Sequence, residues 1–192
     1  MLRRMIILLL FTLLLSYSPI NAQEISDSPG APDETTISDE IEYQLAYPGI
    51  LPGHPLYKLK VLRDKIQIFL ISTPGNKINC YLKQADKGIF ATLLLAENGN
   101  DDLAAQTALK AEHNVTLINS QINGMSEKPD LELFDKLKTA SLKHQETLAS
   151  TKTHLDEEHQ KTIDTVIEFS QRNLNEINRY ESITPDRWST DK

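Results

Sequence analysis

The sequence predicts an all-α protein, an antiparallel bundle of about five helices. Apolar residues recur at steps of three and four from residue 56 onward, whereas no segment shows the period-two alternation of a half-buried strand. Clusters of Gly, Pro and Asn separate the periodic segments from one another. The 192 residues are enough for one domain of ordinary size with additional segments, and the bundle is expected over residues 47–182.

The N-terminus has the pattern of a secretory signal peptide. Arg3 and Arg4 precede a nearly uninterrupted apolar run, Met5 to Leu15, and polar residues follow it. This pattern predicts a signal peptide over residues 1–22 with cleavage after Ala22. The run is shorter than the roughly 18 residues of a membrane-spanning helix, so a membrane is expected as a partner only through an uncleaved signal segment. The expected location is secreted or extracytoplasmic, in the cell envelope.

Residues 23–46 are predicted to form a disordered acidic linker. This segment contains seven acidic side chains and no basic one, and Pro29, Gly30 and Pro32 interrupt it. A segment that binds cations or a partner is the alternative to a solvated spacer. Removal of the signal peptide takes away two Arg and no acid, so the formal charge changes from −7 to −9. Such a charge argues against a nucleic-acid partner, which requires clustered Lys and Arg.

The first helix is expected to begin at Pro55, because proline suits the first helical position. Its apolar positions are so numerous that it should be buried on more than one side. Thr73 is the expected N-cap of a second helix over about 74–98. The apolar positions of the first helix are Leu59, Leu62, Ile66, Phe69 and Leu70, widened by Val61, Ile68 and Ile71.

The remaining helices follow from similar signals. The third is expected from Asp101 or Asp102 to Gly124. Residues 130–180 contain neither Gly nor Pro, and a single helix of that length would extend about 75 Å, so a break is predicted over residues 153–157, where Thr or Asp can cap a new helix. Residues 183–192, which contain the only Trp, are expected to be a flexible tail.

Three histidines are the candidate metal ligands. A hairpin at the predicted break would bring His154 and His159 together near Glu157 or Glu158, and His144 lies on the apolar stripe of the preceding helix. No His-Glu-x-x-His or Glu-x-x-His pattern is present, so satisfied or surface histidines are the alternative. The single cysteine, Cys80, forms no disulfide framework, and no nucleophile or phosphate-loop motif occurs. We therefore expect a protein that is not an enzyme and has no cofactor.

The stretch from Leu51 to Lys60, Leu-Pro-Gly-His-Pro-Leu-Tyr-Lys-Leu-Lys, is followed by an amphipathic helix and then by Lys-Gln-Ala-Asp-Lys at residues 83–87. This combination resembles a bacterial family of domains of unknown function, family 5667, over about residues 47–125. The resemblance implies an extracytoplasmic helical module of bacterial origin and supplies no catalytic residues. The motif is strongest at Pro52, Pro55, Leu56, Tyr57 and Lys60.

Two functional hypotheses follow from these patterns. The first is a non-enzymatic exported helical module that binds a protein or a cell-envelope partner. The second is an extracytoplasmic sensor or carrier domain that binds a metal or a small ligand through the three histidines. An exposed apolar patch would favour the first hypothesis, and a polar cavity that contains two or three histidines would favour the second.

Overall fold

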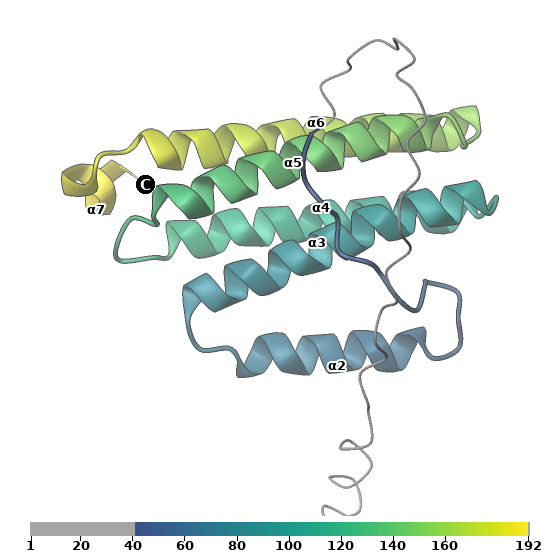
Figure 1. Ribbon diagram of the computed structural model, residues 1–192, viewed down its shortest axis with the longest axis horizontal. Coiled ribbons are helices and arrows are strands. Elements are labelled where there is room, and N and C mark those ends of the chain that lie inside the picture. The colour runs from purple at the N-terminus through teal and green to yellow at the C-terminus, as the bar shows by residue number, and fades with distance from the viewer. Residues whose placement is uncertain (1–40, 192) are drawn as a thin grey trace, which may run out of the picture. The chain divides into compact units, whose positions relative to one another are not determined.

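The structure, a computed structural model, describes residues 41–191. The predicted signal peptide and residues 23–40 of the predicted linker lie outside the described residues. Within residues 41–191 all regular structure is helical, which confirms the all-α prediction (Figure 1). The helices are α2 (Tyr57–Leu70), α3 (Pro74–Glu97), α4 (Asp101–Asn123), α5 (Leu131–Lys152) and α6 (Glu157–Ser182), followed by a 3-10 turn η1 (Pro185–Arg187) and the short α7 (Trp188–Asp191).

Four long helices form the bundle. Helix α3 packs against α4 and α5, and α6 packs against the same two helices, so each helix has two neighbours around a shared core. Figure 1 shows these four helices side by side, with α2 next to α3 at the edge of the bundle. Within the described residues, no helix is long and apolar enough to cross a membrane.

The predicted helix boundaries of the bundle are confirmed. Helix α3 begins directly after Thr73 and ends before the turn at Gly99, which has a φ of 68° that suits glycine. The break within residues 130–180 falls at residues 153–156, as expected. Asp156 is the N-cap of α6, and its side chain accepts a hydrogen bond from the backbone N–H of His159 at 2.9 Å.

The core contains two clusters of buried residues, one toward each end of the bundle. One cluster comprises Ile78, Leu82, Ala85, Val115, Ile118, Ile122, Phe134, Leu137, Ala140, Ile177, Tyr180, Ile183 and Trp188. The other comprises Ile89, Leu95, Ala96, Ala104, Ala108, Ala111, Leu148, Leu155, Ile163 and Val166. Burial of these side chains is the main favourable term in folding. No disulfide adds to it among the described residues.

The segments that flank the bundle are packed, in contrast to the prediction. The expected tail contributes Ile183 and Trp188 to the core, and the Trp188 indole N–H donates to the carbonyl of Met125 at 3.0 Å. At the other end, Tyr43 and Leu45 of the expected linker pack against the two core clusters. These contacts could not be predicted, because isolated apolar residues in polar segments have no periodicity.

Helix α2 differs most from the prediction. It begins at Tyr57 rather than at Pro55, and it contains no buried residue although burial on more than one side was expected. Its apolar positions are therefore available for roles other than filling the bundle core.

Candidate functional site

The turn that leads into α2 is built from residues of the family motif. Gly49 and Gly53 have φ values of 68° and 94°, a region that glycine adopts readily. The Lys60 ammonium reaches back from α2 and donates to the carbonyls of Pro48 at 2.7 Å and Ile50 at 3.0 Å. The first turn of α2 is thus fastened to the loop that precedes it.

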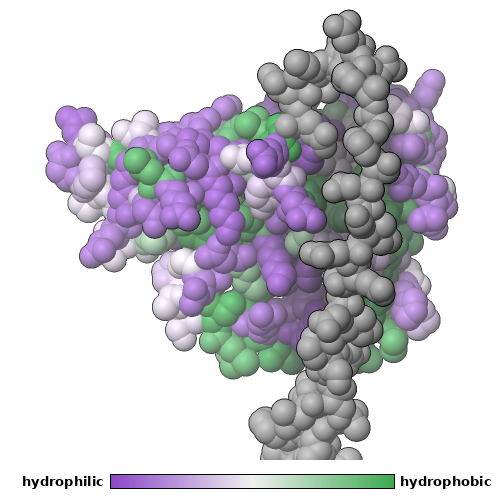
Figure 2. Space-filling model, in the orientation of Figure 1, coloured by the Kyte–Doolittle hydropathy of each residue, from purple (hydrophilic) through white to green (hydrophobic). Residues whose placement is uncertain are grey.

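The outer face of α2, which we define as Leu59, Leu62, Ile66, Phe69 and Leu70, points away from the bundle. Each of these side chains is at least 50% exposed, and Phe69 is 87% exposed. Hydrophobic surface accordingly lies along the lower edge of the molecule in Figure 2, over α2. Such a contiguous exposed patch is typical of an interaction site.

The opposite side of α2 covers a groove on the α3–α4 pair. This α2 groove has a volume of about 670 Å³. Tyr57, Val61 and Ile68 line it from α2, and Gly88, Ala91 and Ala111 line it from α3 and α4. Helices α3 and α4 approach closely here, since a Cβ atom on Gly88 would lie 2.6 Å from that of Ala111.

A buried polar group joins the N-terminal segment to the bundle. Asp86 of α3 accepts a hydrogen bond from the Tyr43 hydroxyl at 3.0 Å, and its other oxygen lies 2.8 Å from Nε2 of His144 on α5. His144 is fully buried, and its Nδ1 has no hydrogen-bond partner among the described residues. Burial and the neighbouring Asp86 carboxylate raise the pKa of Tyr43. This candidate metal ligand therefore contacts a carboxylate inside the core.

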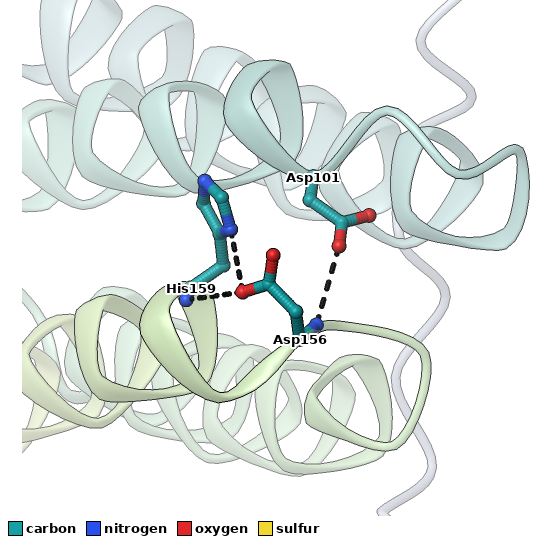
Figure 3. Close-up of side chains that lie close together, drawn as sticks. All are labelled: Asp101, Asp156 and His159. Atoms are coloured by element: carbon teal, nitrogen blue, oxygen red, sulfur yellow. Dashed lines mark hydrogen bonds and ion pairs between the residues drawn. The ribbon is translucent and has the colours of Figure 1, made fainter.

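A second cluster lies where the N-termini of α4 and α6 meet. Figure 3 shows Asp101 on α4 facing Asp156 and His159 on α6, and one ligand atom from each lies within 4.8 Å of the others. His159 Nδ1 lies 2.7 Å from Asp156, and its Nε2 lies 3.1 Å from Asp102. Asp101 accepts the backbone N–H of Asp156 at 3.2 Å.

The chemistry of this cluster is that of a charged cap. Side-chain hydrogen bonds to Asp156 and Asp102 raise the pKa of His159. The backbone N–H of His159, and then its imidazole, lower the pKa of Asp156. A protonated imidazole donates from both nitrogens and has no lone pair for a metal. The carboxylates also suit the positive ends of two helix dipoles. A metal ion at His159 would compete with a proton for a ring nitrogen.

The three candidate histidines do not share one cluster. His159 lies in the cap, His144 is paired with Asp86, and His154 is exposed in the turn between α5 and α6. The predicted break, with an Asp as cap of the new helix, is confirmed at Asp156. The pairing of His144 with Asp86 and the approach of Asp101 to Asp156 were not predicted, because long-range partners have no local signal.

Two further titratable groups are accounted for by their surroundings. Burial raises the pKa of the Cys80 thiol, which opposes formation of a reactive thiolate. Burial also raises the pKa of Glu112 to about 7, although hydrogen bonds from Asn173 and Ser170 act in the opposite direction. Glu112 Oε1 accepts from Asn173 at 2.7 Å, so this carboxyl belongs to a buried polar contact between α4 and α6.

The fold defines a class of helical bundle with a peripheral amphipathic helix. The model of one family, described as Domain of unknown function (DUF5667), matches residues 49–186. The chain belongs to this family, and the match extends beyond the expected range of about 47–125 to cover all the long helices. No curated protein and no solved structure matches the chain.

Proposed function

We propose that this chain is a non-enzymatic exported helical module of bacterial origin that binds a protein or a cell-envelope partner through the outer face of α2. The observation that supports the proposal is the exposure of five large apolar side chains on one helix face. Covering this face with a partner would remove apolar surface from water, which is favourable by about 25 cal/mol per Å² before the costs of association.

The pattern on α2 indicates what the partner offers. Leu59, Leu62, Ile66 and Phe69 follow the 3-4-3 spacing of a helix that packs into an apolar groove. The positions that flank this seam are Lys58, Arg63 and Lys65, all basic. Two copies of α2 would place like charges against each other, so the face suits a partner whose groove has an acidic rim.

A site-specific photo-crosslinking experiment in the native host tests this proposal. A photoreactive side chain at position 69 is expected to give a discrete adduct, whereas the same group at Leu131, an exposed apolar position at the start of α5, is expected to give none. The double variant Arg63→Glu, Lys65→Glu should remove the adduct while leaving the bundle folded. Equal adducts from both positions, or an adduct with the mass of a dimer, would contradict the proposal.

Export is tested separately by cell fractionation and intact mass. The mature chain is expected in the extracytoplasmic fraction with Gln23 at its N-terminus. A chain that retains Met1 and remains in the cytoplasm would exclude the exported part of the proposal.

The second candidate function is a metal-binding or small-ligand-binding sensor or carrier, and the arrangement of Asp101, Asp156 and His159 favours its metal form. Zinc or copper should then raise the unfolding midpoint of the mature chain by mass action. The rise should be lost in His159→Gln and after addition of a chelator. Absence of a rise with either metal would leave the cluster as a helix cap.

A further inference from the structure

The α2 groove differs in charge from the rest of the protein. Five lysines line it, against a single carboxylate, that of Asp64, although the whole chain has a formal charge of −7. Asp64 is held by Arg63, with the guanidinium and carboxylate atoms 2.6 Å apart. The groove is therefore a local concentration of positive charge on an acidic protein. The five lysines are Lys58, Lys60, Lys65, Lys87 and Lys110.

Within residues 41–191, most of these lysines lack an ion-paired carboxylate. Lys58, Lys65, Lys87 and Lys110 form no ion pair with any of the described residues. Lys60 donates only to two neutral carbonyls. Burial lowers the pKa of Lys60, the nearby Asp64 carboxylate raises it, and the positive charges of Lys87 and Arg63 lower it. Cations that repel one another at the mouth of a groove are stabilised when an anion binds between them.

The interior of the groove is apolar, and small side chains form part of its lining. Gly88, Ala91 and Ala111 form its floor, and Val61 and Ile68 contribute to its roof. Tyr81 of α3 and Leu117 of α4 also line the groove, whose volume of about 670 Å³ lies within the range of small-ligand sites, about 300–1,000 Å³. An acidic peptide would leave its backbone N–H and C=O groups against this floor largely unpaired, which is costly. An alkyl chain has no such groups.

From this combination we propose that the α2 groove binds a single-chain anionic lipid of the fatty-acid class, with its alkyl chain on the Gly88–Ala91–Ala111 floor and its carboxylate among the lysines. The two stretches that carry the family resemblance meet at this groove, because Tyr57 and Lys60 line it from α2 and Gln84 and Lys87 line it from α3. The inference concerns the inner side of α2, whereas the proposed partner contacts the outer face. Lys58 and Lys65 lie at the border of the two surfaces, and Lys87 and Lys110 belong to the groove alone.

Calorimetric titration of the mature chain with dodecanoate tests the inference. We expect saturable binding at one site per chain, with much weaker binding of dodecyl maltoside, which has the same alkyl chain and a neutral head, and of acetate, which has the head group alone. Binding of many molecules per chain, equal affinity for the neutral amphiphile, or no binding of dodecanoate would overturn the inference.

Charge-reversal variants locate the site. The double variant Lys87→Glu, Lys110→Glu should weaken dodecanoate binding at least tenfold, and it breaks no ion pair among the described residues. The single variant Lys161→Glu on α6 is a control for charge reversal as such, since it reverses an exposed lysine outside the groove. Thermal unfolding monitored by circular dichroism verifies that each variant is folded. Equal affinity for the folded double variant and for the control would overturn the inference.

Discussion

At the scale of single residues, the polar groups inside the bundle are where the sequence pattern was least informative. Asp86 has a relative exposure of only 5%, and it contacts two residues 43 and 58 positions away. A helical period identifies Asp86 only as a polar interruption of an apolar stripe. Its role follows from the packing of α3 against α5 and the N-terminal segment, because a buried carboxylate requires partners to offset its desolvation.

Glu112 makes stability depend on pH in a predictable direction. Its pKa is about 7 in the folded protein and near 4.5 when exposed to water, so the folded state retains a proton that the unfolded state releases. As the pH rises from about 4.5 to 7, this difference lowers the free energy of unfolding. Above pH 7 both states are ionised and the loss stays constant. At 1.36 kcal/mol per pKa unit the total is about 3 kcal/mol.

The substitution Glu112→Gln should therefore remove this loss of stability at higher pH, because an amide cannot ionise. We expect the variant to gain about 2–3 kcal/mol relative to the wild type between pH 4.5 and pH 8, measured as the difference between their urea unfolding free energies at each pH. The exposed Glu168→Gln serves as the control. If the two curves for wild type and Glu112→Gln run parallel across this range, the carboxyl is not buried in the way described.

At the scale of helices, the sequence predicted which segments are helical and where they end more accurately than it predicted what covers them. Thr73, Gly99 and Asp156 mark predicted boundaries that are confirmed, although the Thr73 side chain forms no capping hydrogen bond. The stripe on α2 was also correctly identified, but periodicity cannot show whether an apolar face meets the core or remains exposed. The α2 groove was not predictable, because it depends on the separation of helices.

The close approach of α3 and α4 at Gly88 predicts that alanine at this position lowers stability, although alanine usually stabilises a helix. A Cβ atom on Gly88 would lie 2.6 Å from Ala111 Cβ and 3.2 Å from its Cα, so the two helices would have to separate. Alanine favours a helix over glycine by about 1 kcal/mol, whereas overpacking costs about 1–3 kcal/mol. We expect Gly88→Ala to lower the free energy of unfolding by up to about 2 kcal/mol.

Gly75 provides a control within the same helix. No atom lies within 4 Å of a Cβ at that position, so Gly75→Ala should leave stability unchanged or raise it by about 0.4–1 kcal/mol. Both variants are compared by urea unfolding. An equal increase in the free energy of unfolding from the two substitutions would mean that α3 and α4 are farther apart than described.

At the scale of the whole described molecule, the segments at both ends close the bundle. Tyr43 and Leu45 pack along one side of it, and Ile183 and Trp188 complete the core at the end formed by the α4–α5 loop. Lys128 of this loop donates to the carbonyl of Glu181 at 2.6 Å, and Lys138 forms an ion pair with the carboxylate of the same residue at 2.8 Å. The cooperative unit therefore extends beyond the four long helices.

Trp188 reports directly on this extended unit. It is the only tryptophan of the chain, it is 2% exposed, and its indole N–H is hydrogen bonded, so the folded protein should show blue-shifted emission that resists aqueous quenchers. Its red shift on urea unfolding should coincide with the loss of helical circular dichroism, as a two-state transition requires. Trp188→Ala, followed by circular dichroism, should lower the free energy of unfolding by about 3–5 kcal/mol. A red shift that precedes the loss of helix would instead show that the C-terminal segment detaches before the bundle unfolds. If Trp188→Ala is as stable as the wild type, the Trp188 side chain does not support the core.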